Sequence, residues 1–350
     1  MMKLYDSIIG CGAVEALEQK FAEYIGTRFA VAMTNCTSAL HAALLASGVK
    51  RGDEVIVPAY TWGGTIAGLL HIGAVPVFAD IDDTLTLDVE DVSRKVTHKT
   101  KAIIAVHLFG HPCHMDRLKS LCQEYDLALI EDCAQAFGAR FRGQHVGSFG
   151  TGCFSFGYTK PICAGEGGMI TTDSADIYDR ILFFTQHPLR QRKDMIDFRE
   201  PNQFSLNYHI HPLTAKSVLE SFDAALQLLE DKKSRYSSLH SAILDTPMKG
   251  LKPVTIADGA EHSWHKYSQE LLPSLTESEH KSIRAFLEEH GYLVEDGYIK
   301  APLYSHSSLK YYLTRRSFRM VQQLSLPATE IACRKRAGIA IRNELKERDD

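Results

Sequence analysis

The sequence has no marked excess of one charge and no long apolar run. Its formal net charge is -4 over 350 residues, which gives no electrostatic footprint for nucleic acid. No stretch approaches the roughly eighteen apolar residues that span a bilayer. The first residues, Met1 to Asp6, contain no apolar signal-peptide core. We therefore expect a cytoplasmic protein that binds neither nucleic acid nor membrane.

The eight cysteines lack the C-x-x-C pairing of zinc ribbons and redox motifs. Their scattered positions argue against a disulfide framework and predict reduced, mostly buried thiols. One local group of possible ligands matches no standard zinc pattern; it comprises His107, His111, Cys113 and His114. We therefore expect no metal centre.

The chain is longer than one hydrophobic core usually supports, so we expect a large domain and a smaller lobe. Short apolar runs alternate with helix-length segments at 29–33, 55–57, 75–78, 102–106 and 127–130. This alternation predicts an α/β fold, with a mainly parallel sheet covered by helices on both faces.

A long amphipathic helix over 217–240 leads out of the sheet domain. We place the large domain at residues 1–230 and a smaller C-terminal α+β lobe at residues 231–350. The lobe is expected to contain a helix over 276–290, which begins with the capping box Thr276 and Glu279, and a basic tail helix over 330–348.

Polar residues follow the predicted strands where each strand ends. Ligands of open parallel sheets bind at the carboxyl ends of the strands, so these side chains are expected to lie along one edge. They are Asn35, Thr61, His107, Asp132 and Ser155.

Lys160 lies among apolar, hydroxyl-bearing and flexible residues, between Phe154 and the glycine-rich turn 165–168. Partial burial lowers the pKa of a lysine and lets its amine form a Schiff base with an aldehyde such as pyridoxal phosphate. The local sequence leaves open an ordinary solvated lysine.

Three other segments allow both a structural and a cofactor-binding interpretation. Residues 35–38 offer either a phosphate site at a helix N-terminus or a plain helix cap. Asp132 ends an apolar strand, where its carboxylate needs a pyridinium, an ion-pair partner or a metal. The aromatic residues of 58–62 either stack on a flat cofactor or pack in the core.

Residues 8–15 partly match a dinucleotide-binding fingerprint. Glu15 stands where that fingerprint ends in glycine or alanine, and no strand of useful length precedes the segment. The pattern therefore argues against a nicotinamide cofactor.

Taken in order, five segments resemble the DegT/DnrJ/EryC1/StrS aminotransferase family: 35–41, 52–62, 106–110, 131–135 and 154–168. The likeness covers residues 10–230 and becomes looser at 298–304 and 324–327. It implies the aspartate aminotransferase fold (fold type I), the cofactor pyridoxal 5'-phosphate and a homodimer with shared active sites.

The resemblance also implies roles for individual residues. Lys160 would form the Schiff base with the cofactor and carry a proton between cofactor and substrate, and Asp132 would bind the pyridine nitrogen. Gln135 would contact the phenolic oxygen and Trp62 would stack on the ring. The phosphate would be held by Thr37, Ser38 and Ser155, with Cys36 as a further cofactor-binding position and Asn207 reaching the phosphate of the neighbouring subunit.

The chain departs from the family pattern at three positions. The family commonly has glycine where Cys36 stands, asparagine where Pro161 stands and arginine where His209 stands. Related sugar dehydratases replace the Schiff-base lysine with histidine. Because this chain keeps Lys160, the resemblance favours transamination over dehydration.

We therefore expect an aminotransferase that moves nitrogen from glutamate or glutamine to a keto-sugar, nucleotide-linked, by a ping-pong mechanism. One alternative acceptor is a cyclitol or another small ketone. A second alternative is a non-catalytic regulatory protein that binds pyridoxal phosphate. Candidate acceptor contacts are His187, His209 and Tyr304.

Overall fold

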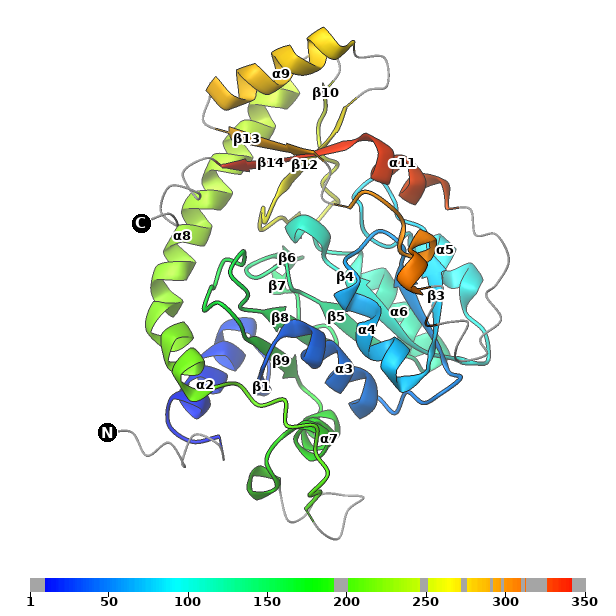
Figure 1. The fold of residues 1–350 in the computed structure, drawn as a ribbon, viewed down its shortest axis with the longest axis vertical. Helices are drawn as coiled ribbons and strands as arrows, with labels where there is room; N and C mark the ends of the chain where they lie inside the picture. The colour runs from blue at the N-terminus through cyan, green and yellow to red at the C-terminus, as the bar shows by residue number, and fades with distance from the viewer. Residues whose placement is uncertain are drawn as a thin grey trace.

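The computed structural model describes residues 10–191, 201–245, 251–271, 276–289, 292–296, 299–309, 312 and 326–341. These residues form a seven-stranded sheet flanked by helices, a four-stranded sheet and a small three-stranded sheet. Figure 1 shows the four-stranded sheet at the far end of the long helix α8 (Pro212–Asp245), beyond the larger sheet.

The seven-stranded sheet has the order β1-β9-β8-β5-β4-β2-β3. Strands β3, β2, β4, β5 and β8 are parallel, and β9 is antiparallel to both of its neighbours. The α/β fold with a mainly parallel sheet is therefore confirmed. The strands are β1 (Phe29–Met33), β2 (Glu54–Pro58), β3 (Val75–Ala79), β4 (Thr100–Val106), β5 (Ala128–Asp132), β8 (Thr151–Ser155) and β9 (Gly168–Thr172).

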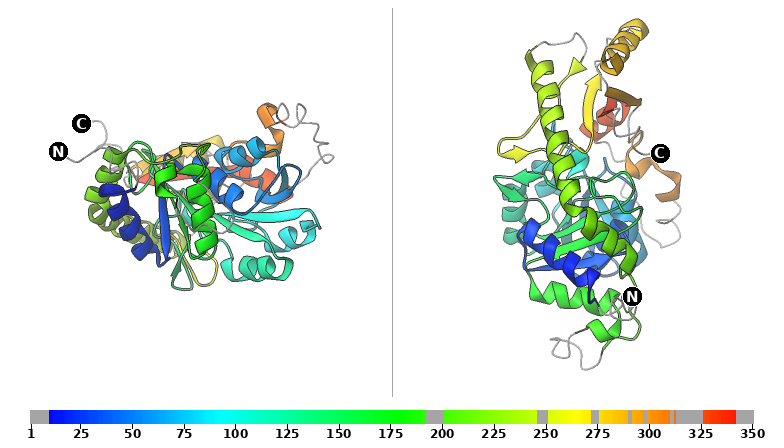
Figure 2. Two further views of the ribbon diagram at one scale, coloured as in Figure 1. Left: turned by 90° about the horizontal axis from the view of Figure 1, so that it is seen from below. Right: turned by 90° about the vertical axis from the view of Figure 1, so that its left-hand side faces the viewer.

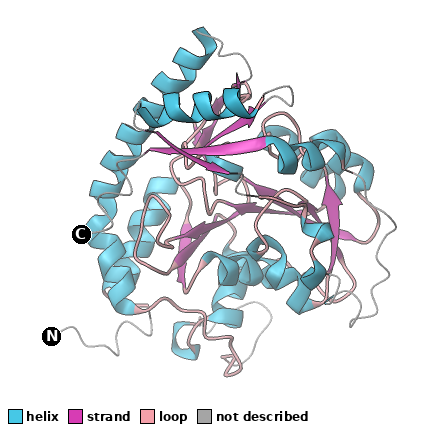
Figure 3. Ribbon diagram, turned by 45° about the horizontal axis from the view of Figure 1, so that its top comes forward, coloured by secondary structure: helices cyan, strands magenta, loops and turns pink. Residues whose placement is uncertain are grey.

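Helices cover both faces of this sheet, as Figure 3 shows. Alternate residues of β4 face different layers: Ile104 and Val106 pack with residues of α3 and α4, whereas Ile103 and Ala105 pack with residues of α5 and α6. The helices of the large sheet are α2 (Ala13–Ile25), α3 (Cys36–Ala46), α4 (Gly64–Ile72), α5 (Val89–Lys95), α6 (Met115–Tyr125) and α7 (Ala175–Thr185).

Helix α8 runs along the side of the molecule and links the two larger sheets (Figure 2). Its first half packs with α2 through Phe222, Leu229 and Phe21. Its second half, with Tyr236, packs against Trp264 and Tyr267 near the four-stranded sheet. The predicted domain boundary at residue 230 falls inside this continuous helix.

The C-terminal part contains the four-stranded sheet and contributes one strand, β11, to the three-stranded sheet, whose strands β6 and β7 precede β8 in the chain. The four-stranded sheet has the order β10-β12-β14-β13, and the three-stranded sheet has the order β11-β6-β7. Thr276 and Glu279 form the predicted capping box of α9 (Glu277–Glu289). The strands are β6 (Arg140–Phe141), β7 (Gln144–His145), β10 (Leu251–Lys252), β11 (Ala260–Glu261), β12 (Tyr267–Leu271), β13 (Tyr292–Asp296) and β14 (Arg336–Ile341).

The predicted tail helix over 330–348 is wrong in its extent. Helix α11 (Pro327–Lys335) ends at Lys335, and the next six residues form β14 between β12 and β13. Ile339 lies opposite Tyr267 on one side and Val294 on the other. Pairing with two strands therefore overrides helix propensity. Residues 342–350 lie outside the described residues.

Within the ranges that the structure describes, no helix is both long and apolar enough to cross a membrane.

Asp80 at the end of β3 ties α11 to the large sheet. Its carboxylate accepts hydrogen bonds from the Thr329 backbone N–H at 2.8 Å, the Thr329 hydroxyl at 2.7 Å and the Ala328 backbone N–H at 3.1 Å. These N–H groups belong to the first turn of the helix, where they have no partner within the helix. The carboxylate therefore acts as a cap supplied from elsewhere in the chain.

We predict that Asp80→Ala lowers the free energy of unfolding by about 1–2 kcal/mol, because a helix cap is lost. Urea denaturation measures the change, and hydrogen exchange at residues 328–335 should accelerate. The control is Asp83→Ala, at an exposed neighbouring position. Equal stability of the two variants would contradict this role of Asp80.

Candidate active site

A cavity of about 600 Å³ opens at the carboxyl edge of the large sheet. Its walls come from the segments that follow β1, β2, β4, β5 and β8. The structure thus brings together the five polar residues that end the predicted strands: Asn35, Thr61, His107, Asp132 and Ser155.

Asp132, the last residue of β5, is buried in this cavity. Burial raises the pKa of its carboxyl group, while hydrogen bonds from the Thr65 hydroxyl and the Ala134 backbone N–H oppose that rise. The Thr65 hydroxyl donates to Oδ2 at 2.8 Å and the Ala134 N–H donates to Oδ1 at 3.2 Å. A carboxylate held in this way can pair with a cationic ring nitrogen.

Lys160 lies in the loop that joins the antiparallel strands β8 and β9. The loop is closed by backbone hydrogen bonds from Phe156 to Gly167 and from Ala164 to Phe156, both 2.9 Å long. Burial lowers the pKa of the Lys160 amine, and the Asp132 charge partly opposes this effect. A lowered pKa increases the fraction of neutral, nucleophilic amine.

The N-terminus of α3 also faces the cavity, which Cys36 and Thr37 line. Asn35 caps the helix by accepting the Ser38 backbone N–H at 2.8 Å, and the Ser38 hydroxyl donates to the Asn35 carbonyl at 2.8 Å. Ser38 therefore belongs to the capping box and does not line the cavity. A helix N-terminus beside hydroxyl groups favours a phosphate.

Gln135 and Trp62 stand on the cavity wall. The Gln135 side-chain oxygen accepts a hydrogen bond from the Phe109 backbone N–H at 2.9 Å. This bond fixes the orientation of the amide and leaves its NH₂ group to donate to another acceptor. The indole of Trp62 is 64% exposed. Exposure at a cavity wall, away from the core, suits a ring that stacks on a ligand.

The C-terminal part supplies His265 and Lys266 to the same cavity. Their segment pairs with the turn η1 (Leu108–Gly110), because the Lys266 N–H donates to the Phe109 carbonyl at 3.2 Å. Gly110 has φ +98°, and a Cβ at this position would lie 2.5 Å from the Ser263 hydroxyl. Only glycine therefore allows this close approach.

Sequence reasoning did not identify Thr65, Glu166, His265 and Lys266 as lining residues. The spacing of Thr65 could have identified it, since it lies four residues after Thr61 in a helix-length segment between two predicted strands. His265 and Lys266 could not have been identified from the sequence, because no local pattern places the C-terminal segment against η1.

Besides Ser38, four predicted residues do not line this cavity in the described chain. Asn207 is exposed with φ +58°. The His187 imidazole accepts the Leu189 backbone N–H at 3.3 Å, and His209 pairs with Met33 through a backbone bridge. The Tyr304 hydroxyl donates to Glu330 at 2.9 Å.

Among the described residues, one buried group could hold a metal by proximity: His107, Glu131 and Cys133. Both ring nitrogens of His107 are already engaged, with Glu131 at 3.1 Å and with the Cys113 backbone N–H at 3.0 Å. Glu131 also accepts three backbone N–H groups, from Gly147, Phe149 and Gly150. This network anchors the loop before β8.

The sequence from residue 6 to 349 matches the DegT/DnrJ/EryC1/StrS aminotransferase family. It is 46% identical over 173 residues to the GDP-perosamine synthase of Escherichia coli O157:H7, covering 49% of this chain and 48% of that protein. It is 33% identical over 306 residues to the GDP-perosamine synthase of Vibrio cholerae, covering 85% of this chain and 80% of that protein.

Among solved structures, the chain is similar to DesV of S. venezuelae, solved in complex with a ketimine intermediate. The TM-score is 0.76 at 25% sequence identity, and the match covers 96% of this chain and 88% of DesV. The match to the E. coli relative, in contrast, spans less than half of that protein.

We predict that Gly110→Ala lowers the free energy of unfolding by about 2–4 kcal/mol, because it combines backbone strain with a clash. The matched control is Gly143→Ala, which also has positive φ but has no atom within 4 Å of the added Cβ. The control should cost only about 1–2 kcal/mol. Urea denaturation compares the two, and equal losses would contradict the close approach of residues 263–266.

Proposed function

The chain belongs to the DegT/DnrJ/EryC1/StrS aminotransferase family, and on that premise we propose that it transfers an amino group from glutamate or glutamine to a nucleotide-linked keto-sugar. The observation that carries the proposal is the single cavity shared by the Lys160 amine, the Asp132 carboxylate and the N-terminus of α3. The relatives named GDP-perosamine synthase support the sugar acceptor.

Pyridoxal 5'-phosphate is the cofactor of this family, and the donor set of the cavity fits it. The α3 N-terminus with Thr37 and Ser155 suits the phosphate, and the buried Asp132 suits the ring nitrogen. Gly64 leaves space beside the Thr37 hydroxyl on the expected phosphate side of the cavity, since a Cβ at position 64 would lie only 2.9 Å from that hydroxyl. When bound, the cofactor supplies an electron-withdrawing ring that carries nitrogen between two substrates.

The protein contributes binding, proton transfer and exclusion of water. Lys160 Nζ, whose pKa is lowered by burial, would take a proton from the substrate carbon and return it at the other reacting carbon. With the cofactor bound, Asp132 would keep the ring nitrogen protonated, and the Gln135 amide would orient the ring through its phenolic oxygen. Since both half-reactions use the same cavity, the 2-oxo acid formed from the amino donor leaves before the acceptor binds, which gives ping-pong kinetics.

We predict that Lys160→Ala reduces turnover at least about 10³-fold, because the nucleophile and the proton carrier are lost together. Borohydride should no longer attach the cofactor covalently to the chain, which mass spectrometry detects. The control is Lys101→Ala, at an exposed position on β4. Retained turnover and retained trapping in Lys160→Ala would refute the assignment.

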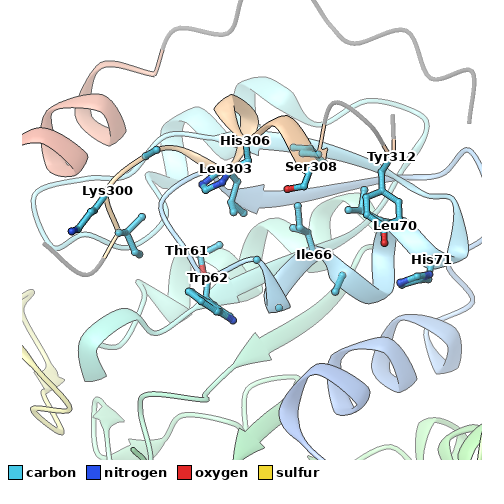
Figure 4. Close-up of a pocket in the computed structure, with 16 residues that line it drawn as sticks. Thr61, Trp62, Ile66, Leu70, His71, Lys300, Leu303, His306, Ser308 and Tyr312 are labelled. Atoms are coloured by element: carbon cyan, nitrogen blue, oxygen red, sulfur yellow. The ribbon is translucent and has the colours of Figure 1, made fainter. Parts of the chain in front are cut away.

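A second cavity, of about 590 Å³, adjoins the first and shares Thr61, Trp62 and Gly64 with it. Figure 4 shows Trp62 and Lys300 at one end and His71 with Tyr312 at the other. Apolar side chains of α4 and of the segment after residue 299 line the part between them: Ile66, Leu70, Leu303 and Leu309.

This second cavity favours an acceptor longer than one sugar ring. A cyclitol or a small ketone would leave it unused, whereas a nucleoside diphosphate attached to the sugar extends past Trp62. Lys300 offers a cation near the shared end, and the apolar walls suit a flat base. The cavity therefore supports the nucleotide-linked acceptor over the smaller alternatives.

We predict that Ala67→Phe, which fills the second cavity from α4, raises KM for a nucleotide-linked keto-sugar about tenfold or more by steric exclusion. The rate at which glutamate bleaches the bound cofactor should stay within about twofold of wild type, because Ala67 does not line the first cavity. Steady-state and stopped-flow kinetics measure both. The control is Ala224→Phe, exposed on α8; an unchanged acceptor KM in Ala67→Phe would argue for a small acceptor.

We also propose a homodimer in which Asn207 of one subunit reaches the phosphate bound by its partner. Asn207 is exposed and does not line the cavity of its own chain. The same segment presents Phe204, which is 94% exposed, and Leu206. An exposed apolar pair beside a polar side chain is the kind of surface that a second subunit covers.

A further inference from the structure

Asp132 depends on hydroxyl groups of the neighbouring α4 segment. The Thr65 hydroxyl lies 2.8 Å from Asp132 Oδ2, and the Thr61 hydroxyl lies 2.9 Å from the Thr65 hydroxyl. All three residues are buried, with exposed fractions of 3% for Thr61, 2% for Thr65 and 6% for Asp132. The three hydrogen-bonded side chains therefore lie in the wall of the cavity with little access to bulk solvent.

The direction of these hydrogen bonds follows from counting protons. A carboxylate only accepts, so the single hydroxyl proton of Thr65 goes to Asp132 Oδ2. Thr65 can then only accept from Thr61, whose own proton completes the chain. Thr61 thus fixes the rotamer of the Thr65 hydroxyl, and Thr65 satisfies the oxygen of Asp132 that the Ala134 N–H does not reach.

The start of α4 builds this arrangement. Thr61 precedes the helix by three residues and Thr65 stands in its first turn, so the two side chains lie one turn apart. The backbone between them is turned by a hydrogen bond from the Thr65 N–H to the Trp62 carbonyl at 3.1 Å. The same turn therefore places Trp62, Thr61 and Thr65 together in the cavity wall.

We propose that Thr61 and Thr65 are positioning residues that keep Asp132 an ionised carboxylate, turned toward the ring nitrogen of the cofactor. The inference rests on the proposed function. Neither hydroxyl is a catalytic residue, since both act through Asp132.

The consequence concerns the proton shared by Asp132 and the ring nitrogen. A hydrogen bond to a carboxylate stabilises its charged form, so removing the Thr65 hydroxyl makes Asp132 more basic. With the cofactor bound, the shared proton would then shift from the ring nitrogen toward the carboxylate. Lys160, His107 and Cys36 also act on Asp132, and they are unchanged by a substitution at Thr65.

The test uses Thr65→Val, which has nearly the same shape but no hydroxyl. The protein is loaded with pyridoxal phosphate labelled with ¹⁵N in the ring, and the ¹⁵N chemical shift reports the protonation of that nitrogen. We expect wild type to show a protonated ring and Thr65→Val a shift toward the unprotonated form. The dissociation constant for the cofactor should rise about tenfold or more, because a hydrogen bond to a charged group is lost.

Two further variants separate positioning from packing. Thr65→Ser keeps the hydroxyl and should restore the wild-type ¹⁵N shift, whereas Thr61→Val should change the shift in the same direction as Thr65→Val but by less. The control is Thr185→Val, which removes an equally buried hydroxyl that bonds to the Ile181 carbonyl. If Thr65→Val fails to fold, Thr61→Val alone still decides the outcome.

The proposal is overturned if Thr65→Val, or Thr61→Val where Thr65→Val does not fold, gives the same ring shift and cofactor affinity as Thr185→Val. It is also overturned if Thr65→Ser behaves like Thr65→Val. Neither readout needs an amino acceptor, so a wrong choice of acceptor leaves the test intact. Failure of wild type to bind the labelled cofactor would instead refute the proposed function.

Discussion

The burial of one carboxylate, that of Asp132 at the end of β5, is the constraint around which the cavity is arranged. A buried carboxylate needs donors to stay charged. The chain meets this need with the Ala134 backbone N–H on one oxygen and the Thr65 hydroxyl on the other. Supplying that hydroxyl fixes the start of α4, which in turn places Trp62 on the cavity wall. The amine of Lys160 then lies in a site where burial lowers its pKa, while the nearby Asp132 charge acts in the opposite direction.

Much of the large sheet could be predicted from the sequence, because its strands are short apolar runs with helices between them. The edge on which Asn35, Thr61, His107, Asp132 and Ser155 converge follows from that topology. The antiparallel direction of β9 could not be predicted, because the apolar pattern of a five-residue strand does not indicate whether it runs parallel or antiparallel to its neighbours. The strand β14 was missed for a related reason: its partners, β12 and β13, lie far away in the sequence.

The contribution of the C-terminal part to the cavity could not be predicted either. His265 and Lys266 reach the cavity because Gly110, which has no side chain, lets the backbone of residues 263–265 pass close to it. No local pattern encodes that approach. All of the individual site assignments stay predictions, and five of the assigned residues do not line the cavity of their own chain: Ser38, His187, Asn207, His209 and Tyr304.

The departure at Cys36 is compatible with the geometry. Its thiol lies 3.4 Å from the Cys153 carbonyl and 4.0 Å from Asp132 Oδ1, and burial raises its pKa well above the ordinary value. It therefore stays a neutral thiol that fills space beside the carboxylate and adds no second negative charge. The structure offers no explanation for Pro161.

Helix α8 has a mechanical consequence. Its 34 residues form one element about 50 Å long that packs at one end with the large sheet and at the other near the four-stranded sheet. A rod held at two separate points cannot tilt at one end without displacing the other in proportion to its length. The segment around Trp264, which brings His265 and Lys266 to the cavity, is therefore held at a set distance from α2 by the length of this helix.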